Sequence, residues 1–209
     1  MSDIHMVQFA MRDGIDPKEI LAMLTGPAER CGWVFSERQK REFSGDRKRP
    51  SSVFDWGKAQ STQYMALSFL NAEHFPNPVL EVSLNNTYFA RSSWFSEERR
   101  EREEARAFSG KLIQFLLRLI EATSPDYGLG DTDFAFSDTQ LTTSVLPPRD
   151  RLIGVLEKKR HKPWLVYFGP ELIRELGKKR IDQLGGTEHH EVAGGILLVF
   201  RKNPSTPAE

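Results

Sequence analysis

With 209 residues, the chain is long enough to bury a large core without a disulfide or a structural metal. Its 39% hydrophobic and 28% charged residues are typical of a globular protein and exclude a disordered chain. Lys plus Arg and Asp plus Glu both number 29, so the zero net charge argues against a dedicated duplex-DNA binder. The single cysteine, Cys31, excludes an internal disulfide and any multi-cysteine zinc site.

The first residues show no basic stretch followed by an apolar run, which is the pattern of a secretory signal. The apolar runs elsewhere are far shorter than the roughly 20 residues that span a bilayer. We therefore expect a cytoplasmic protein.

The N-terminal segment predicts a strand followed by a helix. Apolar residues alternate over His5–Met11, as in a half-buried strand. The helix is expected to begin at Asp16-Pro17, because Asp16 can cap it and proline suits the first helical position. Gly26-Pro27 should end or kink this helix near Thr25, since proline lacks the backbone N–H.

Residues 36–62 are rich in charge and turn formers and show no periodic apolar face, which predicts a long surface loop. Within it, Trp56 could anchor a protein partner, and Arg47, Lys48 and Arg49 could contact the same partner, because tryptophan and arginine are enriched at interface hot spots. The same basic residues beside aromatic ones could also follow a phosphate backbone, although nearby acidic residues dilute their charge.

Two strands are predicted next, at Met65–Phe69 and Val79–Asn85, from the alternation of their apolar residues. In the second, Glu81 and Ser83 point away from the apolar face. Such a polar face is either solvated or covered by a partner. We take Glu81 and Ser83 as further candidate partner-binding residues.

The longest helix is expected to begin at Ser96, with Glu97 and Glu98 in its first turn. Its first half is charged on all sides, which favours a solvated helix with ion pairs four residues apart. The second half carries apolar residues at helical spacing: Phe108, Leu112, Phe115, Leu116, Leu119 and Ile120.

Ser124-Pro125-Asp126 should end the long helix. Phe134–Phe136 resembles a short strand, and Pro147-Pro148 begins a connector that could separate two lobes near 146–150. Four acidic residues lie near Gly128 and Gly130: Asp126, Asp131, Asp133 and Asp138. Their spacing does not match that of a calcium-binding loop, so we expect them to form turns.

The C-terminal third is the most clearly patterned part. Trp164–Phe168 predicts a buried strand, Gly169-Pro170-Glu171 begins a helix, and Lys178–Leu184 forms a second short helix. Glu188–Ala193 and Ile196–Arg201 then form a hairpin around a Gly194-Gly195 turn.

No residue pattern points to catalysis or a cofactor. In a strand, His189 and His190 face opposite sides, so Glu188-His189-His190-Glu191 is not expected to hold a metal without further ligands. Cys31 is better explained as a small buried hydrophobe than as a nucleophile. The glycines lack the spacing of a phosphate-binding loop, and no nucleophile elbow or zinc-protease motif is present.

Three stretches carry a resemblance to a family: Pro163–Leu172, Leu176-Gly177 and Glu191–Leu198. Together with Pro125–Gly128 after a long helix, they resemble bacterial immunity-protein-like families, which neutralise polymorphic toxins. The resemblance implies a cytoplasmic α+β protein that binds a cognate toxin and has no enzymatic activity. It carries over no functional residue.

We therefore predict an α+β fold in which a mostly antiparallel sheet packs against one long helix and two or three shorter ones. A single domain is expected over 1–203, followed by a disordered tail at 204–209. The expected function is protein binding, with a toxin as the partner that the resemblance implies. Two alternatives stay open: a nucleic-acid-associated protein using the basic loop 38–49, and an enzyme of undescribed type.

Overall fold

The computed structural model describes residues 5–12, 15, 17–31, 33–35, 51–56, 64–70, 78–85, 97–132, 146–158 and 162–202. Arg47, Lys48 and Arg49 lie outside these ranges, as do the strand predicted at Phe134–Phe136 and the tail predicted at 204–209.

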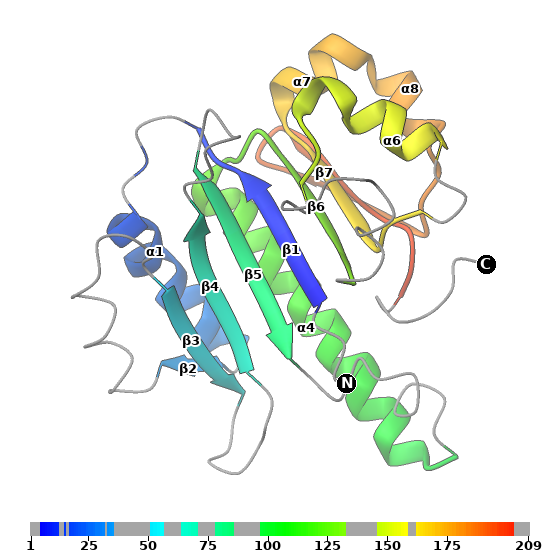
Figure 1. The fold of residues 1–209 in the computed structure, drawn as a ribbon. Helices are drawn as coiled ribbons and strands as arrows, with labels where there is room; N and C mark the ends of the chain where they lie inside the picture. Colours follow the sequence, from blue (N-terminus) through cyan, green and yellow to red (C-terminus); the bar gives the residue numbers. More distant parts are fainter. Residues whose placement is uncertain are drawn as a thin grey trace.

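One antiparallel sheet contains the nine strands of the described residues (Figure 1). Its spatial order is β2-β3-β4-β5-β1-β6-β7-β9-β8, and every neighbouring pair is antiparallel. The strands are β1 His5–Ala10, β2 Trp33–Phe35, β3 Ser51–Trp56, β4 Tyr64–Leu70, β5 Val79–Asn85, β6 Tyr127–Thr132, β7 Leu165–Phe168, β8 Glu188–Val192 and β9 Gly195–Val199.

Helices cover the two faces of this sheet to different extents. Buried side chains of α1 and α4 cluster with one face of the sheet, from β2 to β9. Buried side chains of α6, α7 and α8 pack on the opposite face, over β6, β7 and β9 (Figure 1). The helices are α1 Pro17–Arg30, α4 Arg99–Thr123, the short 3-10 helix η2 Arg149–Arg151, α6 Leu152–Lys158, α7 Pro170–Leu176 and α8 Lys178–Asp182.

The long helix α4 organises the larger core. All six apolar positions predicted for its buried face are buried. The ring of Trp33 on β2 stacks edge-on against Phe115, with 4.7 Å between ring centroids, and this contact fixes one end of the sheet to the helix. The predicted fold class, an antiparallel sheet packed against one long helix with a C-terminal strand–helix–hairpin unit, is confirmed.

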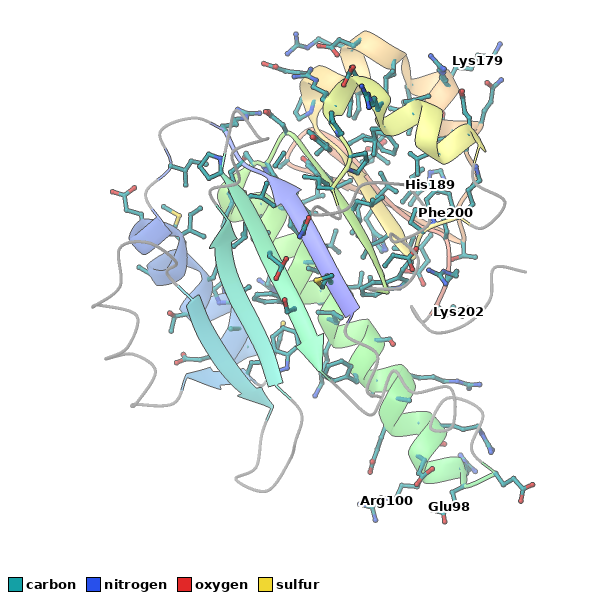
Figure 2. The ribbon with its side chains drawn as sticks, viewed as in Figure 1. Glu98, Arg100, Lys179, His189, Phe200 and Lys202 are labelled. Atoms are coloured by element: carbon teal, nitrogen blue, oxygen red, sulfur yellow. The ribbon has the colours of Figure 1, made fainter. Side chains whose placement is uncertain are left out.

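The first half of α4 also matches its prediction. Arg99 pairs with Glu103 at 2.6 Å and Arg100 with Glu104 at 2.9 Å; the two arginines and Glu103 are largely exposed, and Glu104 is partly exposed. Figure 2 shows Glu98 and Arg100 at the far end of α4, away from the sheet. The predicted cap is wrong, because Glu98 rather than Ser96 occupies the N-cap and makes no capping side-chain bond.

Two strands occupy segments that the sequence assigned to loops or turns. The loop predicted over 36–62 contains β3, which pairs with both β2 and β4. Likewise, the segment predicted as turns after Asp126 is β6, in the middle of the sheet between β1 and β7. Both predictions were wrong because strand pairing outweighs the low strand propensity of serine, glycine and aspartate at these positions.

Of the two alternatives predicted at Gly26-Pro27, an end of the helix near Thr25 is wrong. The helix continues through Pro27 to Arg30. Ala28 lies beyond the proline, one turn after Leu24, and both are fully buried in the core. The free energy gained from burying these two residues offsets the loss of the backbone hydrogen bond that Pro27 cannot donate.

The C-terminal elements follow the prediction closely, with one shift. Gly177 ends α7 with φ of 81°, and α8 follows at once. The hairpin turn, however, is Ala193-Gly194, with φ of 51° and 71°, rather than Gly194-Gly195. Gly195 belongs to β9 and pairs with Val192.

Candidate functional site

The predicted partner-binding residues of β5 lie on the face of the sheet opposite α1 and α4. Leu80 and Val82 point into the core, whereas Glu81 and Ser83, which alternate with them, are partly exposed. Figure 1 shows β1, β5 and β4 in front of α4, with α6, α7 and α8 displaced toward β6 and β7. In the part of the chain that the structure describes, no helix lies in front of β5 on this face of the sheet (Figure 1).

A hydrogen-bond network fixes the carboxylate of Glu81 on this face. Ser83 Oγ donates to Glu81 Oε1 at 2.7 Å, and Gln8 Nε2 donates to Glu81 Oε2 at 2.6 Å. Gln8 lies directly opposite Glu81 in the β1–β5 ladder. Hydrogen bonds to a charged carboxylate are stronger than those between neutral groups, so these two bonds hold the Glu81 side chain in one orientation.

Gln8 connects the Glu81 carboxylate to the segment that begins at Leu146. Its side chain is only 3% exposed, and its Oε1 accepts a 3.0 Å hydrogen bond from the backbone N–H of Leu146. Tyr127 also anchors this segment by donating its hydroxyl to the Pro147 carbonyl oxygen at 3.0 Å. Burial raises the pKa of Tyr127 to about 12, so the hydroxyl keeps its proton at neutral pH. We call the surface formed by the partly exposed Glu81 and Ser83, with the buried Gln8 supporting Glu81, the polar sheet face.

The sequence missed Gln8 because one polar residue within an apolar strand resembles a solvent-facing position. Its pairing with Glu81 depends on the β1–β5 register, and no local pattern in β1 encodes that register.

Trp56 does not lie in a loop. It is the last residue of β3 and lies opposite Trp33 in the β2–β3 ladder. Strand β4 separates β3 from β5, so the structure places Trp56 two strands away from Glu81 and Ser83.

The histidines of β8 face opposite sides of the hairpin, as predicted. His190 is opposite Leu197, which belongs to the α4-side core, whereas His189 is opposite Leu198 of the other core. His190 Nε2 lies 3.0 Å from Glu188 Oε2. Among the described residues, no three His, Cys, Asp or Glu side chains come together as metal ligands would.

Glu191 on the other side of β8 pairs with Lys178 of α8 at 2.7 Å. The hydrogen bond and the opposite charge raise the pKa of Lys178 and lower that of Glu191. This exposed pair joins the hairpin to α8 and is a structural contact.

Glu188 and His190 form one wall of an open cleft of about 570 Å³ beneath α4. Arg106, Ser109 and Gly110 of α4 line the same cleft, as does Lys202 after β9. Figure 2 shows Lys202 just beyond β9, on the side nearest α4. We call this hollow the α4 cleft, and no sequence motif indicated it.

Cys31 is buried at the end of α1, with 6% of its surface exposed. Burial raises the pKa of its thiol, with nearby Arg118 and Arg30 acting in the opposite direction. The predicted burial of Cys31 is confirmed.

Asp131 of β6 is buried rather than exposed in a turn, with 3% of its side chain accessible. It accepts a hydrogen bond from Arg201, whose side chain is 11% accessible. Asp126 contacts Arg12 at 3.6 Å. These two acids of the predicted cluster therefore serve to join strands and loops.

No protein-family model matches the chain, and no curated protein matches it. Among solved structures, it is similar to one titled as the Pseudomonas aeruginosa T6SS protein PA0821, with 11% sequence identity and a TM-score of 0.48. The match covers 97% of this chain and 66% of that one.

None of the helices among the described residues has both the length and the apolar character needed to cross a membrane.

Proposed function

We propose that this chain is a non-enzymatic binding protein of the immunity type, which neutralises a cognate protein toxin by direct contact. The observation that carries the proposal is the polar sheet face. There, hydrogen bonds hold the Glu81 carboxylate in place on a part of the sheet that no described helix covers. The resemblance of the C-terminal third to immunity-protein-like families supports the toxin as partner.

An ordered carboxylate suits recognition of a basic or hydrogen-bond-donating group. Each oxygen of Glu81 accepts one described hydrogen bond, and a carboxylate can accept about four in total. Ser83 and Gln8 already orient the Glu81 carboxylate. Binding of a partner's arginine or lysine therefore costs little side-chain entropy of Glu81. Arg47, Lys48 and Arg49 remain proposed partner contacts from the sequence alone.

Affinity capture from the source lysate, with and without nuclease, tests the binding role. The wild-type chain should retain a protein partner after nuclease treatment. Glu81→Lys should lose that partner, because it places a cation where the partner's cation binds. Glu103→Lys makes the same charge change on an exposed part of α4 and should retain the partner.

A second variant protects this test against misfolding. Ser83→Arg adds bulk and charge to the polar sheet face while leaving Glu81 intact. We expect both polar-face variants to keep a cooperative melting transition and to lose the partner. Retention of the partner by both folded variants would refute the assignment to this face.

Toxin neutralisation is tested with the captured protein. Its expression alone in a bacterial host should stop growth, and co-expression of this chain should restore growth. A captured protein without toxicity would contradict the immunity role while leaving protein binding intact.

Partners that disappear after nuclease treatment, together with steep loss of binding as salt is raised, would instead support nucleic-acid association. That result would make the basic stretch 38–49 the next segment to mutate.

A further inference from the structure

The α4 cleft has the size of a small-molecule site. Its volume of about 570 Å³ falls within the range of roughly 300–1,000 Å³ that is usual for ligand pockets. Ile113 and Val199 are apolar residues of its lining, and both are buried. The rest of the cleft is lined mainly by polar and charged side chains.

Ser109 gives the first indication of a ligand. Its side chain lines the cleft, only 5% of the residue is exposed, and its hydroxyl has no hydrogen-bond partner among the residues that the structure describes. A buried polar group without a partner costs about 1–3 kcal/mol. The hydroxyl is therefore a donor that a bound molecule can satisfy.

Gly110, the next residue, gives the second indication. It lies in the interior of a 25-residue helix, where glycine costs about 0.5–1 kcal/mol relative to alanine. Apart from its chain neighbours and the adjacent helix backbone, no atom of the described residues lies within 4 Å of the position that a Cβ would take, so core packing against these residues does not require a glycine. A ligand that approaches the helix backbone from the cleft would require one.

The charges around the cleft define the chemistry of this ligand. Arg106 lies one helical turn before Ser109, on the same side of α4, and Lys202 enters from beyond β9. Neither cation forms an ion pair with a described carboxylate. The one acidic residue in the lining, Glu188, is already paired with His190.

We propose that the α4 cleft binds a small molecule through an oxyanion group, either phosphate or carboxylate. Arg106 and Lys202 pair with the oxyanion, the Ser109 hydroxyl donates a hydrogen bond to it, and Gly110 allows it to approach the helix. This site lies on the other side of the sheet from the polar sheet face. The proposal is independent of toxin binding.

Isothermal titration calorimetry on the purified full chain tests the proposal, with inorganic phosphate, AMP and succinate as probes at constant ionic strength. At least one probe should bind saturably. Phosphate and AMP binding without succinate binding would assign a phosphate group, and the reverse would assign a carboxylate. Tighter binding of AMP than of phosphate would show that the cleft also contacts the body of the ligand.

Matched variants locate the binding. Arg106→Gln should weaken binding of the best probe by about tenfold or more, because a charge-assisted contact is lost. Arg118→Gln removes the same charge from an exposed site of α4 outside the cleft and should leave the affinity unchanged.

Ser109→Ala and Gly110→Ala separate binding from stability. Both variants should melt at or above the wild-type temperature, because one removes an unpaired hydroxyl and the other a helix-interior glycine. Both should nevertheless bind the probe several-fold more weakly. Failure of all three probes to bind saturably, or equal weakening by Arg106→Gln and Arg118→Gln, would overturn the proposal.

Discussion

Gly195 shows how a single residue fixes the packing of the C-terminal hairpin. A Cβ at this position would overlap the hydroxyl of Tyr167 and would lie 2.5 Å from the carbonyl oxygen of Phe168. Both belong to β7, the strand that pairs with β9. The glycine therefore lets the hairpin approach β7 closely, while the conformational freedom of glycine is used at Gly194.

We expect Gly195→Ala to destabilise the protein by about 3 kcal/mol, because β7 and β9 would have to separate. Urea denaturation gives this difference. The control is Gly154→Ala in α6, where the added Cβ meets no described residue beyond its own helix within 4 Å and the helix gains about 0.5–1 kcal/mol. Equal stabilities for the two variants would contradict this account of Gly195.

The buried thiol of Cys31 should react slowly in the folded protein. Its raised pKa lowers the fraction of reactive thiolate, and its burial blocks the reagent. At pH 8 we expect iodoacetamide to modify the native chain slower than the urea-unfolded chain by about tenfold or more. The native chain reacts more slowly because burial keeps the thiol neutral, so that it ionises only at a higher pH than in the unfolded chain. Equal rates would show that Cys31 is accessible.

At the level of elements, the sequence predicts best where the local pattern and the tertiary packing agree. In the C-terminal third, Pro170 begins a helix, Gly177 ends it, and the strand before it is buried on both faces. Helix α6 was missed although Leu152 and Leu156 are buried one turn apart, because only two turns follow Pro148 and the pattern is short.

Strand β6 could not be predicted from its own residues. Gly128 and Gly130 lower strand propensity, yet a Cβ at Gly130 would lie 3.0 Å from both Leu165 and Val7. The glycines are present because neighbouring strands contribute large side chains to the same space. That requirement depends on the strand order, which no local window of sequence contains.

The same reasoning applies to the candidate site. Alternation within β5 predicted that Glu81 and Ser83 would lie outside the core, and both are partly exposed. The partner of Glu81 on β1 and the unpaired hydroxyl of Ser109 depend on contacts between distant segments. Trp56 was assigned to a loop because charged residues surround β3.

The hairpin turn offers a test at the element scale. Ala193 and Gly194 both have positive φ, as a two-residue type I′ turn requires, and alanine adopts this conformation at a cost. Ala193→Asn should stabilise the protein by about 0.5–1 kcal/mol, because asparagine tolerates the left-handed region. Thermal unfolding measures the effect, and a lower melting temperature would contradict the assigned turn.

At the scale of the whole molecule, β1 joins the two halves of the sheet. It pairs with β5 on one side and β6 on the other. One buried cluster extends from Trp33 on β2 to Trp164 beside β7, so both halves share the core beneath α4. This arrangement favours a single folding unit over two lobes divided near 146–150.

We therefore expect one cooperative unfolding transition. Tryptophan fluorescence, which reports on all four tryptophans including the buried Trp33 and Trp164, and far-UV circular dichroism should give coincident urea curves. Two separate transitions would show that the lobes fold independently.

The central claim is that a protein partner binds the polar sheet face. The most direct measurement places a photo-cross-linking amino acid at Ser83 and, in a separate variant, at the exposed Lys179 of α8. After irradiation in the nuclease-treated source lysate, we expect a discrete protein adduct with the probe at position 83 and none with the probe at position 179. An adduct only at position 179, or equal adducts at both positions, would contradict the account.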